Sequence, residues 1–298
     1  MALYKITNDA SLELIKENDF KLEKEIQNLT EKNLETIFGY RLVSSEFSHN
    51  SFRIDSLAFD SEASSFVIIE YKRDRNFSVI DQGYAYLSLM INNKADFILE
   101  FNEKTSSSLK RDEVDWSQSK VIFVAPSFTN YQKEAINFKD LPIELWEVKR
   151  YSNYSISYSR IPSKGAKESI RTIAPELDVN TTETVKVYTE DDHLALCTDE
   201  IKELYGKFKL AALNLGNIEV IAKKKYIAFV ADTNVADVTI QKNAMKIWIN
   251  LDKGKLDDPK QLARDVSDVG HWGNGDYELQ IKDDENLEYI LSLIKQAI

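Results

Sequence analysis

The sequence is poor in cysteine, proline and glycine. Of its 298 residues, one is cysteine, five are proline and nine are glycine. The lone Cys197 cannot form a disulfide within the chain, and no charged segment followed by an apolar one opens the sequence, so a cytoplasmic location is expected. The low proline and glycine content excludes collagen-like proteins and argues against disorder. A folded protein with ordinary hydrophobic cores is therefore expected.

Long apolar runs and an excess of basic residues are also missing. The longest apolar runs, such as 66–69 and 121–125, fall far short of the ~20 residues that a membrane-spanning helix needs, so no membrane role is expected. The 38 Lys and Arg residues against 49 Asp and Glu give a net charge of −11. An acidic protein repels phosphate at long range, so any contact with nucleic acid would depend on a local basic surface.

The spacing of apolar residues divides the first half of the chain into helices and short strands. Helical spacing predicts helices over 10–38, 78–91 and 129–138. Short apolar and β-branched runs predict strands over 40–46, 52–59, 65–71, 96–101, 120–125, 142–150 and 154–160. The first three of these strands read as a meander. This order of elements predicts a mixed α/β sheet.

A break in every periodic pattern marks the expected boundary between two domains. Pro162, Gly165, Pro175 and the threonine-rich stretch 181–184 lie in this break. We expect a first domain over 1–160, a linker over 161–187 and a smaller α+β domain over 188–298. The last should contain helices over 198–213 and 285–297 and strands near 217–221, 225–231, 235–241 and 245–250.

Two neighbouring strands carry acidic side chains that could meet. Asp55 lies on the strand 52–59, and Glu70 and Lys72 lie at the end of the strand 65–71. Alternation puts Glu70 and Lys72 on one face, and a hairpin would bring Asp55 beside Glu70. Two carboxylates offer the hard oxygen ligands that Mg²⁺ prefers, and such a site suits phosphodiester hydrolysis. The alternative is a solvated Glu–Lys pair that contributes only ~0–1 kcal/mol to stability.

The context of Glu70, rather than the Glu-x-Lys pattern, carries this signal. An acidic residue two positions before a lysine occurs about as often as composition predicts by chance. Such triplets begin at Asp19, Glu70, Glu147, Glu200 and Asp258. Only Glu70 follows a strand of buried type with an aspartate-bearing strand directly before it.

With these residues the sequence resembles the PD-(D/E)XK nuclease superfamily over roughly residues 20–160. The following helix adds residues 82–86, Gln-Gly-Tyr-Ala-Tyr, which are similar to the QxxxY element of the RecB-like branch. Glu35 best matches the glutamate that many members carry on the opening helix, and Glu31 is the alternative. Ile54 replaces the proline of the family pattern. The resemblance implies a restriction endonuclease-like α/β sandwich with a central mixed sheet, followed here by the smaller α+β domain.

The resemblance also implies a function. It points to a Mg²⁺-dependent nuclease that hydrolyses DNA in restriction, repair or defence, with Mn²⁺ as a substitute cofactor. The metal ligands would be Asp55, Glu70 and Glu35. Lys72 would orient or activate the attacking water, and Gln82 and Tyr86 would position the scissile phosphate or the loop around it. A non-catalytic nucleic-acid or partner-binding protein that retains the nuclease fold is the alternative. An oligomeric scaffold and a homodimer also stay open.

Basic residues interleaved with tyrosines favour a surface for nucleic acid, because one neutralises phosphate and the other stacks on bases. The window 149–171 has six basic residues and one acidic residue, with Tyr151, Tyr154 and Tyr158 among them. The candidate contacts are Arg53, Arg73, Arg75, Lys149, Arg150 and Arg160. Solvated charges beside core tyrosines are the alternative, and Arg53 could simply pair with Asp55 or Glu46.

The segment from about residue 188 resembles a domain family of uncharacterised function that recurs behind nuclease-like domains. Residues 223–229 and 269–278 carry this resemblance. Members have been labelled predicted transport proteins, for which this chain, without a membrane span, offers no physical basis. Glycines in the second stretch permit close backbone approach or positive φ. That turn either frames a pocket with His271 and Trp272 at its mouth or packs tightly onto the domain core.

Overall fold

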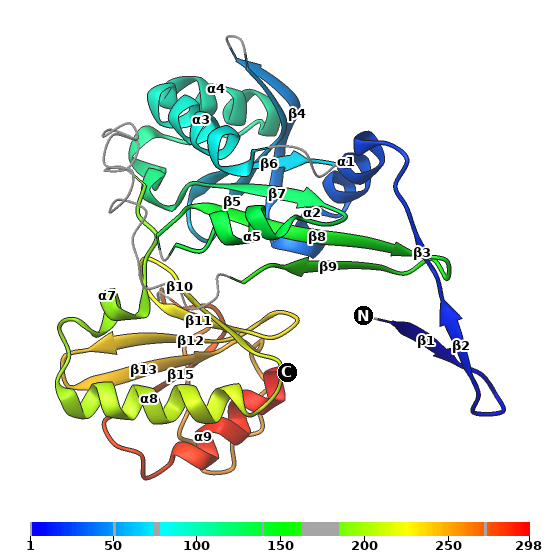
Figure 1. Ribbon diagram of the computed structural model, residues 1–298. Coiled ribbons are helices and arrows are strands. Elements are labelled where there is room, and N and C mark those ends of the chain that lie inside the picture. The colour runs from blue at the N-terminus through cyan, green and yellow to red at the C-terminus, as the bar shows by residue number, and fades with distance from the viewer. Residues whose placement is uncertain (1, 50–51, 74–77, 139, 163–184, 271–272) are drawn as a thin grey trace. The chain divides into compact units, whose positions relative to one another are not determined.

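The structure is a computed structural model that describes the chain except for residues 1, 50–51, 74–77, 139, 163–184 and 271–272 (Figure 1). Two compact units make up the chain, Met1–Val187 and Tyr188–Ile298. Most of the predicted linker lies outside the described residues. Within the described part of the chain, no helix combines the length and the apolar character that crossing a membrane requires.

A mixed sheet forms the centre of the first unit. Its strands are β3 (Glu17–Asn18), β4 (Arg41–His49), β5 (Phe52–Asp60), β6 (Ser65–Tyr71), β7 (Lys120–Ala125), β8 (Ile143–Tyr151) and β9 (Ile156–Arg160). The strand order is β3-β8-β7-β6-β5-β4, with β9 also paired to β8. β4, β5 and β6 form an antiparallel meander, whereas β6, β7 and β8 run parallel. The residues that follow the three parallel strands therefore emerge on the same edge of the sheet.

Helices cover both faces of this sheet (Figure 1). On one face lie α1 (Glu23–Lys32) and α2 (Leu34–Phe38), and on the other lie α3 (Val79–Asn92), α4 (Lys94–Thr105) and α5 (Asn130–Ala135). Two short 3₁₀ turns, Arg111–Glu113 and Trp116–Gln118, precede β7. The predicted α/β sandwich with a central mixed sheet is confirmed.

The central strand β6 explains why an acidic residue can be held rigidly here. Its sequence is rich in β-branched and aromatic residues, and every residue of the strand is buried. Phe66 and Ile68 pack toward α3 and α4, and Val67 and Ile69 pack toward α1. By this alternation Glu70 lies on the face covered by α3, where Gln82 of that helix contacts it.

The predicted helix over 10–38 is wrong in its first part. Residues Leu3–Ile6 (β1) and Leu12–Ile15 (β2) form an antiparallel hairpin, and the helix begins only at Glu23. Leu12 and Ile15 have helical spacing, whereas Leu12 and Leu14 fit the period of two of a strand. The pairing of Leu12 with Ile6 and of Leu14 with Tyr4 decides for the strand.

The strand predicted over 96–101 is also wrong, because these residues belong to α4. Phe97, Ile98 and Phe101 are its buried residues, and their separations of one, three and four positions place them on one helical face. A short apolar run does not distinguish a strand from a buried helix by periodicity alone. The structure settles the choice because this face packs on the aromatic core beneath it.

The second unit is an antiparallel sheet with helices. Its strands are β10 (Glu219–Ala222), β11 (Ile227–Val230), β12 (Asn234–Gln241), β13 (Ala244–Ile249), β14 (Arg264–Asp265) and β15 (Tyr277–Ile281), in the order β10-β11-β12-β13-β15-β14. The helices are α7 (Glu190–Leu194), α8 (Asp199–Leu213), α9 (Leu287–Ile294) and a 3₁₀ turn over Lys295–Ala297. The first four strands and two main helices match the predicted ranges within a few residues, whereas β14 and β15 were not predicted.

The glycine-rich turn before β15 is packed against β13. A Cβ on Gly273 would lie 2.6 Å from Cδ2 of the Trp248 ring. Gly275 has a φ of +93°, and a Cβ there would overlap the carbonyl oxygen of Ile249. Tight packing therefore accounts for both glycines. His271 and Trp272, the predicted mouth of a pocket, lie outside the described residues.

Replacing Gly275 with alanine is expected to destabilise the second unit by more than about 3 kcal/mol, because the positive φ and the overlap with a backbone carbonyl add up. Gly216→Ala is the matched control, since nothing lies within 4 Å of a Cβ at that position. Urea denaturation followed by circular dichroism measures both. A Gly275→Ala protein as stable as Gly216→Ala would contradict this packing.

Candidate active site

Asp55 is the residue of β5 that lacks a register partner on both neighbouring strands. The ladder between β4 and β5 omits the pair Glu46 and Asp55, and the ladder between β5 and β6 ends at Ser56 and Ile69. The Asp55 carboxylate instead accepts a hydrogen bond from the Tyr71 backbone amide, with 3.0 Å between Oδ2 and N. The side chain is thereby held where the two strands part.

Glu70 is buried at the end of β6, with 4% of its surface exposed. Its Oε1 accepts hydrogen bonds from Lys72 Nζ at 2.8 Å and from Gln82 Nε2 at 2.9 Å. Its Oε2 is buried and has no hydrogen-bond partner among the described residues. A buried carboxylate oxygen without a donor is unfavourable. This oxygen therefore suits a cation.

Gln82 and Tyr86 join helix α3 to the ends of two strands. They lie four residues apart, on one face of the helix. Gln82 Nε2 donates to the Tyr86 hydroxyl at 3.1 Å, and that hydroxyl donates to the Arg53 carbonyl of β5 at 3.1 Å. Burial, and secondly the charge of Glu70, raises the pKa of the Tyr86 hydroxyl. Tyr86 therefore stays protonated and acts as a donor.

The charge of Glu70 affects the Asp55 carboxylate. Burial, with the charge of Glu70 as the second cause, raises the pKa of Asp55 to about 6, while the Tyr71 amide and Lys72 act in the opposite direction. Two acidic groups held together away from water are unfavourable as long as both are ionised. A bound cation would relieve this repulsion, so the electrostatics and the donor-free oxygen of Glu70 favour the same kind of ligand.

Replacing Asp55 with asparagine is expected to stabilise the metal-free protein at neutral pH. The rise in pKa from 3.8 to about 6 corresponds to about 3 kcal/mol, or about 2 kcal/mol after a discount for partial exposure to water. Because the folded state binds the proton more tightly, the wild type loses this stability as the pH rises from about 4 through 6. The Asp55→Asn protein does not lose stability in this way, and its side-chain oxygen can still accept the hydrogen bond from the Tyr71 amide.

Urea denaturation in EDTA measures this difference. At pH 8 the Asp55→Asn protein should be more stable than the wild type by about 2 kcal/mol, and at pH 4 the two should be nearly equal. A variant that is less stable at pH 8 would show that the carboxylate is not under electrostatic strain.

The Glu147 triplet has the same acidic-x-Lys pattern as the Glu70 triplet but different ion-pair partners. Glu147 forms an ion pair with Lys133 at 2.8 Å, and Lys149 forms one with Glu17 at 3.1 Å. The two residues of this triplet therefore bind other partners. In the triplet of Glu70, by contrast, the lysine binds the acidic residue itself.

The structure does not bring the third predicted metal ligand, Glu35, to the site. α1 ends at Lys32, and Glu35 lies exposed on the separate helix α2. Among the described residues, no three His, Cys, Asp or Glu side chains form a group that could hold a metal. The predicted trio of Asp55, Glu70 and Glu35 thus does not form such a group in the described part of the chain. The helix break at Asn33 is the reason, because it changes the direction of the chain before Glu35.

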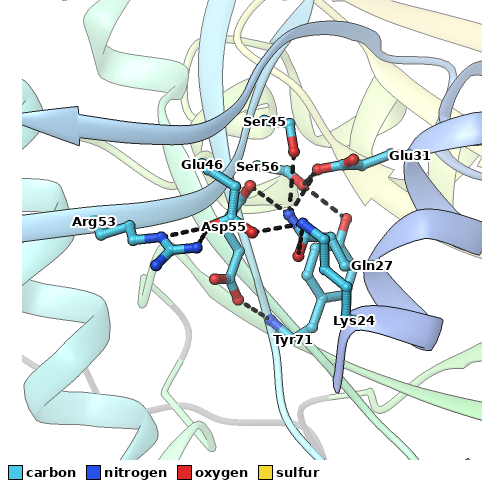
Figure 2. Close-up of polar contacts among 9 residues, drawn as sticks. All are labelled: Lys24, Gln27, Glu31, Ser45, Glu46, Arg53, Asp55, Ser56 and Tyr71. Carbon is cyan, nitrogen blue, oxygen red and sulfur yellow. Dashed lines mark hydrogen bonds and ion pairs between the residues drawn. The ribbon is translucent and has the colours of Figure 1, made fainter. Parts of the chain in front are cut away.

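Glu31, the alternative to Glu35 as a metal ligand, faces β5 but forms hydrogen bonds with Gln27 and Ser56. Its Oε1 accepts hydrogen bonds from Ser56 Oγ at 2.6 Å and from Gln27 Nε2 at 2.9 Å, as Figure 2 shows. Ser56 also contacts the Tyr71 hydroxyl at 3.1 Å, on the sheet face opposite Glu70. Glu31 thus contacts β5 through Ser56, on the face of the sheet opposite Glu70.

Most of the predicted nucleic-acid contacts are bonded to other groups of the protein. The ion pairs are Arg53 with Glu46, Lys149 with Glu17, Arg150 with Glu25 and Arg160 with Glu144, and the Arg73 guanidinium donates to the Lys21 carbonyl. Arg75 and residues 164–171 lie outside the described residues. Of the three tyrosines, Tyr151 is buried, Tyr158 bonds to Thr30, and Tyr154 is fully exposed. The described basic residues of the window, Lys149, Arg150 and Arg160, thus contribute mainly to the fold.

Comparison with known proteins places the chain in a family. It is 55% identical over 290 residues to an uncharacterized protein of Haemophilus influenzae, and the match covers 96% of each chain. The chain belongs to the family of this Haemophilus protein. A family model described as a domain of unknown function, DUF5655, matches residues 190–298. This match confirms the resemblance of the C-terminal segment to an uncharacterised domain family.

Solved structures similar to this chain include a repair endonuclease from Pyrococcus abyssi, with 20% sequence identity and a TM-score of 0.23. The match covers 41% of this chain and 45% of the endonuclease. SfsA of Pyrococcus furiosus, solved in complex with Ca²⁺, is 14% identical with a TM-score of 0.27 and coverage of 53% and 74%. The chain spans less than half of the first of these proteins.

Proposed function

We propose that the first unit is a metal-dependent nuclease that hydrolyses phosphodiester bonds in DNA, with Mg²⁺ as the cofactor and Mn²⁺ as a substitute. The observation that carries this proposal is the buried Oε2 of Glu70, which has no donor among the described residues, beside the partly buried carboxylate of Asp55. The resemblance to the PD-(D/E)XK superfamily supports it, because the same residues form that pattern. Restriction, repair or defence is the setting that the resemblance suggests.

Asp55 and Glu70 would hold the metal. Both offer carboxylate oxygens, and two protein carboxylates with several waters are a usual environment for Mg²⁺. When bound, the ion would lower the pKa of a water and neutralise charge that develops on the phosphodiester. The residues present fit this group, because Glu70 Oε2 lacks any other partner in the described part of the chain.

Lys72 is the candidate for direct action on the reacting atoms. Its ammonium group contacts Glu70 Oε1 and its side chain is 20% exposed. It carries three donors, so it has the capacity to hold a water or a phosphate oxygen while it binds Glu70. Gln82 and Tyr86 act differently, because their hydrogen bonds end on Glu70 and on the Arg53 carbonyl. We assign them as positioning residues.

Arg53 and Arg73 are the described basic residues that would meet DNA near the site. The Arg53 side chain is 67% exposed and pairs with Glu46 at the edge of the sheet. A phosphate could replace Glu46 as its partner at little cost, since exposed ion pairs are worth at most ~1 kcal/mol. Arg73 follows Lys72 and is exposed.

A non-catalytic DNA-binding protein is the second candidate function. The observation that favours it is the lack, among the residues described, of a third acidic side chain at the site. Such a protein would bind DNA without hydrolysing it.

Incubation of the purified full-length chain with plasmid, single-stranded and branched DNA tests the proposal. Cleavage of at least one substrate is expected with Mg²⁺ or Mn²⁺ and none with EDTA. A Glu70→Gln protein purified in the same way controls for contaminating nucleases and should be inactive. DNA binding without cleavage of any substrate would favour the second candidate, and cleavage in EDTA would overturn the metal mechanism.

A further inference from the structure

A non-glycine residue in the left-handed region interrupts β4 directly beside Asp55. Glu46 has a φ of +58°, and it is left out of the ladder that otherwise joins β4 to β5. Its side chain binds Lys24 and Arg53. Such a conformation costs on the order of 1–3 kcal/mol and persists only where its surroundings enforce it. The interruption leaves Asp55 without a register partner on β4.

A buried glutamine of α1 supplies the missing donor. Gln27 is 3% exposed, and its Nε2 lies 2.9 Å from the Asp55 carbonyl oxygen. The same amide nitrogen lies 2.9 Å from Glu31 Oε1 and 3.3 Å from Ser45 Oγ. Lys24 Nζ donates to Gln27 Oε1 at 3.0 Å, which fixes the orientation of the amide. Figure 2 shows these groups converging from α1 on the strand that carries Asp55.

Asp55 consequently accepts one hydrogen bond at its backbone carbonyl and one at its side-chain carboxylate. Gln27 holds its backbone carbonyl, and the Tyr71 amide holds its carboxylate. A strand residue with ordinary neighbours would have its backbone direction set by the ladder, but here a side chain replaces the ladder. Without the Gln27 amide, the peptide at Asp55 could rotate and carry the carboxylate away from Glu70.

We infer that Gln27 is a positioning residue that directs the Asp55 carboxylate toward the metal site. This inference rests on the proposed function. Groups behind a metal ligand commonly change metal affinity by about 10- to 100-fold when they are removed, because they hold the ligand in its binding orientation.

Gln27→Met tests the inference, because methionine matches glutamine in length and lacks the N–H donor. We expect the full-length variant to bind Mn²⁺ about 10-fold more weakly than the wild type in titration calorimetry, with kcat for DNA cleavage lowered and KM for DNA little changed. Gln132→Met is the matched control. Gln132 is also a buried glutamine, 6% exposed, but its amide caps α5 through Thr129. This control should keep the Mn²⁺ affinity of the wild type.

If Gln27→Met does not fold, Gln27→Asn provides a second variant, since its amide is one methylene too short to reach Asp55. Weaker Mn²⁺ binding in either Gln27 variant, with wild-type binding in Gln132→Met, supports the inference. Wild-type affinity in the Gln27 variants, or an equal loss in Gln132→Met, overturns it and leaves the proposed function standing. A wild-type protein that binds no Mn²⁺ overturns the proposed function and this inference together.

Discussion

Replacing Glu70 with glutamine is expected to lower metal-dependent DNA cleavage by at least about 10³-fold without unfolding the protein. Glutamine has the same shape, and its one carbonyl oxygen can still accept the hydrogen bonds that Lys72 and Gln82 make to Oε1. The donor-free position of Oε2 would then carry an NH₂ group. That group repels a cation and cannot replace the lost negative charge.

Glu147→Gln is the control for this experiment. Glu147 also precedes a lysine by two residues on a strand of the same sheet, and it forms an ion pair of the same length, 2.8 Å, with Lys133. Steady-state cleavage of the DNA that the wild type cuts best, with folding checked by circular dichroism, compares the two variants. Full activity in Glu70→Gln, or equal losses in both, would remove Glu70 from the mechanism.

The second large effect is expected from Lys72→Met, which should lower kcat by about 10²- to 10³-fold, within the usual range for a group that assists proton transfer. Methionine retains most of the apolar stem and removes the ammonium group beside Glu70 Oε1. Binding of Mn²⁺ should be unchanged or tighter, because a positive charge next to the carboxylates is lost.

Lys133→Met removes a comparable ion-paired lysine and should leave kcat unaltered. The informative result is the combination of slow cleavage with intact metal binding in Lys72→Met. If metal binding and cleavage fell together, Lys72 would act only by orienting the Glu70 carboxylate. Its assignment as a residue that contacts the reacting atoms would then be wrong.

Much of the candidate site could be predicted because it lies on elements with clean periodicity. Residues 65–71 alternate as a strand and 79–92 repeat as a helix, so the sequence alone places Glu70, Lys72, Gln82 and Tyr86. The meander also brings Asp55 close to Glu70, since its carboxylate accepts a hydrogen bond from the amide of the next residue, Tyr71. These are local relations that a period of 2 or 3.6 determines.

Other parts of the site depend on breaks in regular structure, which periodicity does not reveal. Glu35 was predicted as a ligand because its position best matches the glutamate that many family members carry on the opening helix, but the helix breaks at Asn33 and Glu35 lies on α2. Gln27 went unrecognised because its role arises only where Glu46 leaves the ladder. Its spacing of four from Glu31, on the face of α1 that also buries Ile26, was the one available signal.

The ion pairs of the basic window 149–171 could not be predicted for a different reason. Charge counts along the sequence predicted a surface for nucleic acid, but Lys149 and Arg150 pair with acidic residues near the start of the chain. Arg160 pairs with Glu144 on β8, which lies just outside the window. A local count cannot include partners that only the fold brings near.

The location of a bound Mn²⁺ ion tests the central claim most directly. Crystals of the full chain soaked in Mn²⁺ and measured near the manganese absorption edge should show an anomalous peak within about 2–2.5 Å of a carboxylate oxygen of Asp55 and of Glu70 Oε2. The Glu70→Gln protein, treated identically, should show no peak there. A wild-type crystal without density between these two carboxylates, or with its only strong peak elsewhere, would contradict the account.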